Sequence, residues 1–476
     1  MKNKTILQYL QEKHIIVDGL CNGQKQCGRC KVKVLNRDLE PNIKEKTFLS
    51  EKELNEGIRL ACFHQYCRDD QIITMSQQMQ IEDRLDIINE VGKYQGIGVI
   101  IDIGTTTIVM KWIDRSCGEC KKTVSFINPQ VSFGGDVMSR IHYQNKTQTT
   151  YLHDILVASI EQELIKENIE INQMIICGNT TMIHFFLGED VSSLGQAPFH
   201  VYRKEMCRIS SQNIFKKYKY ECEIITFPHI SAFVGGDIVA GILALNMDIS
   251  DQNILLLDLG TNGEIVVGNK NSFIVTATAA GPAFEGVGMS CGGGSVSGAI
   301  DYVHLDPLYI HTINDAKAKC ICGSGYVSLI SQLVEKKLIS SMGKIKDGKE
   351  IRLTNDIYIN QNDISQFQLA KAAIQTGIEV LLKDTNVDYI YIAGGFGSHL
   401  KIDDFKRIKV VPKDIENIET MGNSAIKGCY QLLMSQDFER VNQIVAKSKA
   451  INLAEYEDFE DCLIESLYFY DEDYIL

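Results

Sequence analysis

Two stretches of this chain place an acid, a glycine and hydroxyl side chains at a turn between two apolar runs. The first runs from Val99 to Met110 and has Asp102 before its glycine; the second runs from Leu255 to Val267 and has Asp258. Apolar, β-branched runs on both sides of a short glycine turn predict a β-hairpin. Such a turn offers hydroxyls and backbone N–H groups to phosphate oxygens, and a carboxylate that can hold Mg²⁺ directly or through water. One copy alone could be an ordinary hairpin, but the repeat favours a pair of phosphate-binding hairpins.

A third glycine-rich turn and one further acid extend this predicted site. The strand-like run 388–392 ends in Ala393-Gly-Gly-Phe-Gly397, which presents backbone N–H groups and a flat surface to a ligand at the start of a helix. Asp237 is the one acid in the stretch 228–243. We consider Asp237 a candidate for orienting an attacking water, with a helix-start cap as an equally weighted alternative.

Cysteines near the N-terminus have the spacing of a metal centre. Cys21, Cys27 and Cys30 form a C-x5-C-x2-C pattern on a glycine-rich loop, and Cys62 lies far downstream. Three cysteines on one loop and a distant fourth favour a 2Fe–2S cluster, whereas zinc sites usually pair two C-x2-C units. Cys67 is the rival fourth ligand. The segment resembles the β-grasp 2Fe–2S ferredoxins, in which the last ligand follows an Arg-Leu-Ala-like strand, and this resemblance selects Cys62.

Two other metal candidates are weaker. Cys117 and Cys120 fall where a turn is due and lack a partner pair, so a plain β-turn is favoured. His184 follows a predicted strand and loop, and we expect a helix-face residue there rather than a metal ligand.

The elements that must position these residues divide the chain into four parts. We predict a ferredoxin-like domain at 1–81, a tether at 82–96, a first lobe at 97–245 and a second lobe at 246–476. Within the first domain, the pattern predicts a helix at 6–14 and strands at 15–17 and 31–35. A helical stretch to about 168, helices at 323–337 and 363–382, and a docked acidic helix near the C-terminus complete the expectation.

Composition narrows the possible functions. The 476 residues carry a net charge of −13, which argues against a general nucleic-acid binder. No apolar leader and no run of about 18 apolar residues occurs, so we expect a cytoplasmic protein without a membrane span. The P-loop pattern G-x-x-x-x-G-K-[ST] and an N-terminal G-x-G-x-x-G are both missing, which argues against those two nucleotide folds.

The two hairpins and the late glycine turn, in this order, resemble the acetate and sugar kinase/heat-shock chaperone/actin superfamily from about residue 97 onward. The resemblance implies two ribonuclease-H-like α/β halves with ATP and Mg²⁺ between them, after an α+β ferredoxin domain. It implies that Asp102 and Asp258 place magnesium. The residues that would hold the phosphates are Gly104, Thr105, Thr106, Thr107, Gly260, Thr261, Asn262 and Gly263, and those that would meet the adenosine are Gly394, Gly395 and Gly397.

The fusion with a 2Fe–2S domain resembles the reductive activators of corrinoid proteins. The resemblance extends to Asn128-Pro-Gln, Gly178-Asn-Thr-Thr, Gly281-Pro-Ala-Phe-Glu-Gly and Gly422-Asn-Ser-Ala. It implies ATP-driven reduction of Co(II) to Co(I) on a corrinoid protein of a methyltransferase system, an upstream low-potential electron donor and a homodimer. It also leads us to expect that a middle domain of longer relatives is missing. Three alternatives stay open: an electron injector for another low-potential acceptor, a small-molecule kinase, and a redox-sensing nucleotide-binding module.

Overall fold

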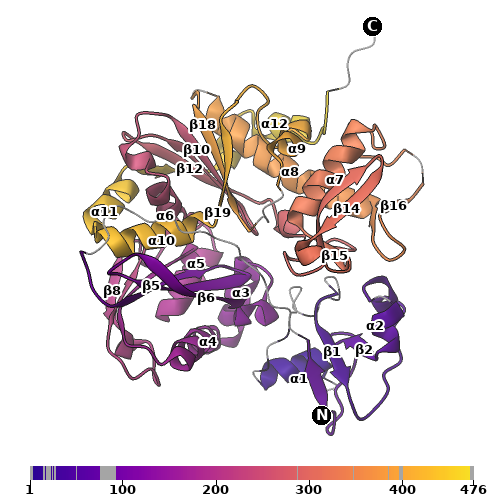
Figure 1. Ribbon diagram of the computed structural model, residues 1–476, viewed down its shortest axis with the longest axis horizontal. Coiled ribbons are helices and arrows are strands. Elements are labelled where there is room, and N and C mark those ends of the chain that lie inside the picture. Colours follow the sequence, from indigo (N-terminus) through magenta and orange to yellow (C-terminus); the bar gives the residue numbers. More distant parts are fainter. Residues whose placement is uncertain are drawn as a thin grey trace.

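The computed structural model describes residues 4–13, 15, 17, 23, 25, 28–49, 51–75, 93–286, 288–346, 348–383, 385–395 and 400–471. Figure 1 shows three units: a small indigo unit at the N-terminus and two larger lobes, one above the other. The predicted tether lies mostly outside the described residues, as do Cys21, Cys27 and Gly397.

The N-terminal unit, called the ferredoxin unit below, is built on an antiparallel sheet in the order β2-β1-β3. Its elements are α1 (Ile6–Glu12), β1 (Lys31–Val34), η1 (Glu45–Thr47), α2 (Glu51–Asn55), β2 (Ile58–Leu60) and β3 (Ile72–Thr74). Helix α1 starts with a capping box between Thr5 and Gln8 and buries Ile6, Leu7 and Leu10. The strand predicted at 15–17 is wrong, because neither Ile15 nor Val17 lies in a strand.

The first lobe contains a six-stranded sheet in the order β6-β5-β4-β7-β9-β8. Its elements are β4 (Ile97–Ile103), β5 (Thr107–Asp114), β6 (Glu119–Ile127), η2 (Pro129–Phe133), α3 (Val137–Thr147), α4 (Tyr151–Glu167), β7 (Ile171–Gly178), α5 (Thr180–Leu187), η3 (Ser192–Gly195), β8 (Cys207–Ser210), η4 (Ser211–Asn213) and β9 (Glu223–Thr226). The helical stretch expected up to about 168 is two helices, because Gln148 adopts a left-handed conformation that ends α3.

The second lobe contains a six-stranded sheet in the order β19-β18-β10-β11-β12-β20. Its strands are β10 (Ile254–Leu259), β11 (Gly263–Gly268), β12 (Phe273–Thr278), β18 (Tyr389–Gly394), β19 (Ile418–Gly422) and β20 (Ser448–Ala450), with α8 (Gln361–Leu382), α11 (Phe438–Ala446), η8 (Leu453–Glu455) and α12 (Phe459–Ser466). An inserted part holds η6 (Pro282–Glu285), β13 (Ala299–Leu305), β14 (Leu308–Thr312), η7 (Ile313–Asp315), β15 (Cys320–Ile321), α7 (Gly323–Glu335), β16 (Glu350–Arg352) and β17 (Tyr358–Asn360), and α9 (Ile402–Arg407) follows β18.

The two sheets repeat one topology. In the first, the hairpin strand β4 is antiparallel to β5 and parallel to β7; in the second, β10 is antiparallel to β11 and parallel to β18. Helices α6 (Gly236–Ala244) and α10 (Ser424–Ser435), with η5 (Met247–Ile249), lie between the sheets, as the centre of Figure 1 shows. One apolar core joins Ile100 of the first sheet and Leu256 of the second to both helices. This repeat confirms the expected pair of ribonuclease-H-like halves.

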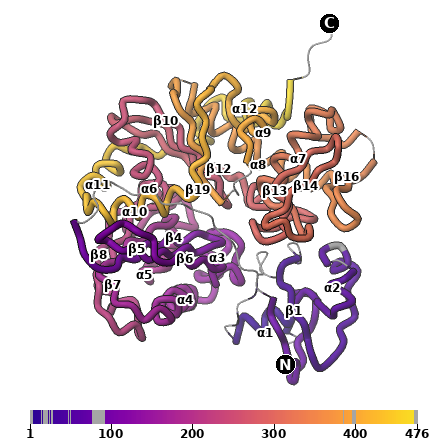
Figure 2. The backbone as a smooth tube through the Cα atoms, in the orientation of Figure 1, coloured from indigo at the N-terminus to yellow at the C-terminus, as the bar shows by residue number. Residues whose placement is uncertain are grey.

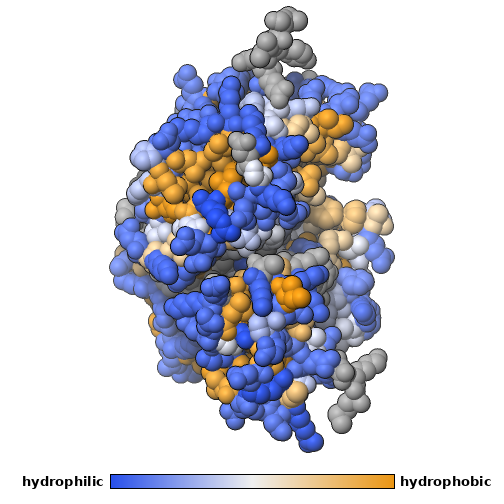
Figure 3. Space-filling model, turned by 90° about the vertical axis from the view of Figure 1, so that its right-hand side faces the viewer, coloured by the Kyte–Doolittle hydropathy of each residue, from blue (hydrophilic) through white to orange (hydrophobic). Residues whose placement is uncertain are grey.

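The C-terminal segment docks on α8, as predicted. Buried Lys371 of α8 donates through Nζ to the carbonyl oxygens of Ser466 and Tyr468, both at 2.7 Å, and Phe469 is fully buried. No helix among the described residues is long and apolar enough to span a membrane. Figure 3 looks onto the side of the inserted part and the ferredoxin unit, where hydrophobic residues gather mainly in the upper half.

Candidate nucleotide and iron–sulfur sites

Strand alternation places three acids in the space between the two sheets. In β4, Val99 and Ile101 belong to the outer core of the first lobe, whereas Ile100 faces the core between the sheets. Asp102 shares the side of Ile100 because side chains alternate along a strand. The same reasoning places Asp258 with Leu256 in β10, and Glu264 with Val266 in β11. Asp258 and Glu264 also stand opposite each other in the β10–β11 register.

The first hairpin turn is held by neutral side chains and an arginine of its own lobe. Its backbone closes through a hydrogen bond from Gly104 N to Thr107 O (3.0 Å), and Nδ2 of Asn128 donates to Gly104 O (2.9 Å). Asn179, the N-cap of α5, donates from Nδ2 to Oγ1 of Thr105 (2.9 Å). A buried arginine, Arg140, donates to Thr105 O (2.5 Å), and burial lowers its pKa to about 9. This turn is therefore fixed on several sides.

The second hairpin turn closes in the same way but is surrounded by acids. Gly260 N donates to Asn262 O (2.9 Å), and Oγ1 of Thr278 donates to the carbonyl oxygen of Gly263 (3.1 Å). Thr261 donates from Oγ1 to Oε2 of Glu285 (3.2 Å). The second turn thus meets a carboxylate at the hydroxyl that we predict for phosphate binding.

Helix α10 connects the acids of the two hairpins through consecutive residues at its start. Nδ2 of Asn423 donates to Oδ2 of Asp102 (2.8 Å), and Oγ of Ser424 donates to Oδ2 of Asp258 (3.3 Å). Asn423 is also the N-cap of α10, because its Oδ1 accepts from Ile426 N (2.8 Å). Both acids are therefore oriented by one helix start.

Three acids around the second hairpin have raised pKa values in the absence of a cation. Burial raises the pKa of Asp258 to about 6, against a hydrogen bond from Ser424. Burial and then the charges of Asp258 and Asp102 raise the pKa of Asp237 well above its usual range. The pKa of Glu264 is also raised well above its usual range, by burial and then by the charges of Asp237 and Asp258. A divalent cation would relieve this mutual repulsion.

Asp237 lies near both hairpin acids and also contacts its own helix. It is in the first turn of α6, whose N-cap is Gly235, and its Oδ1 accepts from Ile238 N (2.9 Å). The side chain is partly exposed, and the charges of Asp258 and Asp102 act on it. Both readings of Asp237, as a water-orienting acid and as a helix-start residue, fit this position, and its role stays a prediction.

The late glycine turn lies beside the second hairpin. Strand β18 pairs in parallel with β10, which places Gly394 opposite Leu259 and Ala393 opposite Asp258. Gly394 has φ +128°, a conformation that favours glycine, and Gly395 O accepts from Oγ of Ser295 (3.3 Å). The predicted adenosine turn therefore begins at the same sheet edge as the predicted phosphate turn, although Gly397 lies outside the described residues.

The ferredoxin unit brings two of the four predicted cluster ligands together. Cys30 precedes β1 and Cys62 follows β2, and these strands pair with Lys31 opposite Leu60. Ala61 N donates to Cys30 O (2.8 Å), and both cysteines are buried, at 1% and 4% exposure. Cys67, the rival ligand, is exposed. The buried thiol pair fits a thiolate-held cluster at this end of the sheet, with Cys21 and Cys27 to complete it.

Other candidate ligands do not gather into a metal site. Within the described ranges, no three His, Cys, Asp or Glu side chains are grouped so that they could hold a metal ion. Magnesium bound through one or two carboxylates, waters and phosphates needs no such group. Cys117 lies in the turn between β5 and β6, and Cys120 is the second residue of β6; both are free thiols.

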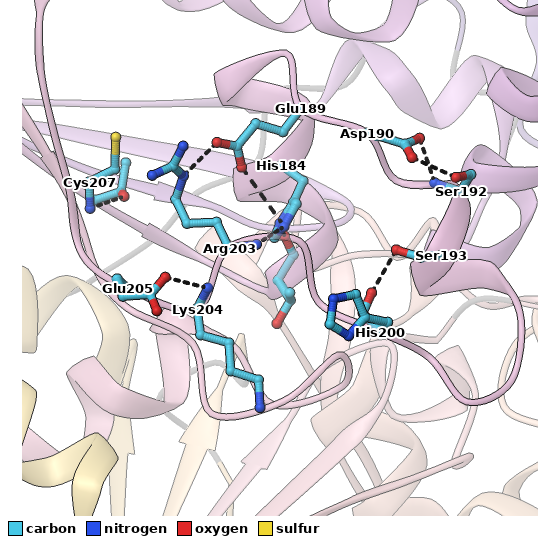
Figure 4. Close-up of polar contacts among 12 residues, drawn as sticks. His184, Glu189, Asp190, Ser192, Ser193, His200, Arg203, Lys204, Glu205 and Cys207 are labelled. Atoms are coloured by element: carbon cyan, nitrogen blue, oxygen red, sulfur yellow. Dashed lines mark hydrogen bonds and ion pairs between the residues drawn. The ribbon is translucent and has the colours of Figure 1, made fainter.

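His184 is a buried helix residue, as predicted. Its Nδ1 is 2.7 Å from Thr180 O in the same helix, and its Nε2 accepts from Arg203 N at 3.4 Å. Figure 4 shows Glu189 between His184 and Arg203, and Nε of Arg203 is 2.5 Å from Oε1 of Glu189. Burial lowers the pKa of His184, so the imidazole is held neutral.

Four residues of this site were not identified from the sequence. Glu264 could have been noticed as the one charged residue of an apolar strand. Glu285 lies inside a motif that we matched without giving it a role. Asn423 and Ser424 reach the hairpin acids from a distant part of the chain, and no local pattern indicates those contacts.

Family models match nearly the whole chain in three consecutive segments. Residues 1–65 match a 2Fe–2S iron–sulfur cluster binding domain, residues 97–250 match the RACo middle region, and residues 252–475 match the C-terminal ASKHA domain of RACo. The expectation of a missing middle domain is wrong, because the middle region is what the first lobe matches.

Individual relatives agree with these matches. The chain is 33% identical to "Corrinoid activation enzyme RamQ" of Eubacterium limosum over 386 residues, which cover 71% of this chain and 64% of the relative. It is 25% identical over 396 residues to the "[Co(II) methylated amine-specific corrinoid protein] reductase" of Methanosarcina barkeri, with 74% of this chain and 72% of that protein covered.

A solved structure titled "Reductive activator for corrinoid,iron-sulfur protein" matches with a TM-score of 0.72 and 26% identity, over 98% of this chain and 95% of that one. The ferredoxin unit, the two lobes and their order along the chain are therefore shared with that protein. The middle region and the ASKHA domain of RACo, preceded by a 2Fe–2S domain, follow one another along almost the whole chain, and the chain belongs to the RACo family.

Proposed function

We propose that this protein uses ATP to drive an electron from its 2Fe–2S domain onto a corrinoid protein whose cobalt has oxidised to Co(II), restoring Co(I). The observation that carries the proposal is the match to a reductive activator over 98% of the chain. The paired hairpins, linked by α10, and the buried Cys30–Cys62 pair provide the two parts that this activity needs. A small-molecule kinase reaction would leave the 2Fe–2S domain without a use.

In this proposal the hairpin turns bind the phosphates and their acids place magnesium. Thr105 to Thr107 and Thr261 to Gly263 offer hydroxyl and backbone N–H donors, and Asp102 and Asp258 offer carboxylates oriented by Asn423 and Ser424. Magnesium ATP, when bound, supplies a polarised γ-phosphate for hydrolysis. Asp237 is our candidate for orienting the water, because its raised pKa lets it hold or accept a proton near neutral pH.

The energetic purpose of coupling is to overcome an unfavourable electron transfer. One electron moved against about 59 mV costs about 1.4 kcal/mol, so a mismatch of a few hundred millivolts needs roughly 5–7 kcal/mol. A nucleotide that inverts a two-state equilibrium supplies about this much. The proposal includes an upstream low-potential electron donor, a homodimer and a cytoplasmic location.

The test is the visible spectrum of a Co(II) corrinoid protein mixed anaerobically with this protein and a low-potential reductant. We expect Co(I) only when MgATP is added. Cys62→Ala should abolish Co(I) formation, and Cys67→Ala is the matched control, because Cys67 is exposed and stands five residues away. Co(I) formed equally without ATP, or formed by Cys62→Ala, would refute the proposal.

A further inference from the structure

Arg29 of the ferredoxin unit has one buried guanidinium nitrogen without a hydrogen-bond partner among the described residues, and its charge acts on the second lobe. It stands between the predicted ligand Cys27 and Cys30, and its Nη2 is buried and unpartnered in the described part of the chain. Its charge acts on Glu285 and on Cys320, both in the inserted part of the second lobe. Figure 2 likewise shows the ferredoxin unit directly below that part. A guanidinium donor buried without an acceptor indicates a missing anionic group.

Glu285 connects Arg29 to both hairpins. Its Oε2 accepts from Oγ1 of Thr261 (3.2 Å). Burial raises the pKa of Glu285, and the hydrogen bond from Thr261, the charge of Arg29 and a hydrogen bond from Thr106 act in the opposite direction. Glu285 thus shares hydroxyl donors with the two turns that we propose for phosphate binding, and each hydroxyl has only one proton to donate.

The ferredoxin unit also contacts the first lobe close to its hairpin. Oγ of Ser132 donates to Val17 O (2.5 Å), and Val17 N lies 3.3 Å from the same oxygen. Nε2 of Gln11 donates to Ser132 O. Ser132 belongs to η2, whose N-cap Asn128 donates to Gly104 O of the first turn. The unit therefore contacts the first lobe near its hairpin, and through the charge of Arg29 it acts on Glu285, which accepts hydrogen bonds from both turns.

We propose that Arg29 is a phosphate-sensing residue that the ferredoxin unit contributes to the nucleotide site. When a triphosphate binds at the turns, Thr106 and Thr261 donate their hydroxyl hydrogen bonds to it. The Glu285 carboxylate loses these two donors and is free to pair with Arg29. The triphosphate also brings negative charge near the buried guanidinium. Both changes strengthen the attraction between Arg29 and the lobes, so bound ATP holds the ferredoxin unit against them, and loss of the γ-phosphate loosens it.

This inference rests on the proposed nucleotide site, and its test is binding rather than activity. We would measure the dissociation constants of a non-hydrolysable ATP analogue and of ADP with Arg29→Gln, by calorimetry on cluster-loaded protein. The expected result is an analogue affinity about tenfold weaker, with ADP affinity changed less than twofold. Arg29→Lys, which keeps the charge, should recover part of the loss.

Lys25→Gln is the matched control, because Lys25 lies on the same loop but faces the ring of Phe63 in its own unit (5.2 Å). It should bind both nucleotides like the parent. The cluster's visible spectrum verifies that Arg29→Gln retains the cluster. Glu285→Gln weakens the same interaction from the second lobe, without a substitution in the ferredoxin unit.

Hydrogen exchange provides the second readout. The ATP analogue should slow amide exchange at 5–17 in the parent but not in Arg29→Gln or Glu285→Gln. The inference would be overturned if Arg29→Gln and Lys25→Gln had equal nucleotide affinities. It would also be overturned if the ATP analogue did not change amide exchange at 5–17 in the parent protein. ATP-dependent Co(I) formation alongside such a result would leave the proposed function standing and reject the role of Arg29 alone.

Discussion

The two hairpins have turns of equal length at equivalent places in their sheets, yet their surroundings differ. The first turn is held by Asn128, Asn179 and Arg140 of its own lobe. Glu285 accepts hydrogen bonds from hydroxyls of both turns, and the second hairpin also pairs Asp258 with Glu264, whose pKa is raised by Asp237 and Asp258. One half of the site is therefore fixed before any ligand arrives, whereas the other is a cluster of acids that a cation and a nucleotide would change. If the proposed function holds, we expect nucleotide binding to change the second hairpin more than the first.

The largest predicted effect is a loss of ATP turnover, together with a gain in stability, when the acid of the second hairpin is replaced. Asp258→Asn should lower ATP turnover by about 100-fold or more, because it removes a carboxylate that places magnesium. At pH 7 it should also stabilise the nucleotide-free protein by about 1–3 kcal/mol, since it removes an acid whose pKa burial raises to about 6. Turnover assays and urea unfolding measure the two effects.

Asp102→Asn is the comparison variant for the first hairpin. It should lose turnover without gaining stability, because the hydrogen bond that Asp102 accepts from Asn423 (2.8 Å) is shorter than the one that Asp258 accepts from Ser424 (3.3 Å). Equal gains in stability for the two variants would contradict the difference between the hairpins.

The next prediction concerns the glycines of the two turns. A Cβ on Gly104 would lie 2.5 Å from Thr107 O, whereas the nearest atom to a Cβ on Gly260 is 3.9 Å away. Gly104→Ala should therefore cost about 1–3 kcal/mol of unfolding free energy, and Gly260→Ala less than about 1 kcal/mol. Urea unfolding of both variants decides the point, and a reversed order would show that the second turn is the more constrained one.

Acidification should weaken the first lobe through a buried histidine. Burial, and then the charge of His184, lower the pKa of His229 to about 3, and its Nδ1 has no partner among the described residues. The unfolded chain binds this proton below about pH 6.5 and the folded chain does not, so stability falls as pH falls. The loss should reach about 2 kcal/mol at pH 5.

The measurement for His229 is the difference in melting temperature between pH 7 and pH 5. His229→Gln should reduce that difference by several degrees. His200 is exposed and lies outside the helices and strands, so it offers the control His200→Gln, which should leave the pH dependence unchanged. Identical pH dependence in both variants would mean that His229 does not carry the effect.

The smallest predicted effect tests the start of α10. Asn423→Ala removes a helix cap and the donor to Asp102, so it should cost about 1–2 kcal/mol. Ser424→Ala removes only the 3.3 Å hydrogen bond to Asp258 and should cost about 0.5 kcal/mol or less. Exchange of amides in the first turn of α10 should rise more in the first variant, and equal rises would argue against the capping role.

The sequence allowed the prediction of those features that depend on local pattern. The alternation in β4 and β10, the glycine turns and the cysteine spacing indicated both hairpins and the paired Cys30 and Cys62. The strand at 15–17 failed because Val17 makes its hydrogen bonds with Ser132 of the first lobe instead of with a neighbouring strand. A contact over 115 residues of chain leaves no signal in a short apolar run.

The parts of the site that could not be predicted depend on tertiary contacts. Asn423 and Asp102 are 321 residues apart, and only the packing of α10 between the sheets brings them together. Asp237 was found as the one acid in the stretch 228–243, but its role depends on charges from both lobes. These roles could not be predicted because the interacting residues are far apart in the sequence.

The central claim is that nucleotide at the hairpins drives electron transfer from the ferredoxin unit. The most direct test is a single turnover: the anaerobically reduced protein, freed of external reductant, is mixed with a Co(II) corrinoid protein with and without MgATP. We predict that the electron paramagnetic resonance signal of the reduced cluster is lost, and a matching amount of Co(I) gained, only with MgATP. Equal transfer without nucleotide, or ATP hydrolysis with the cluster signal unchanged, would contradict the account.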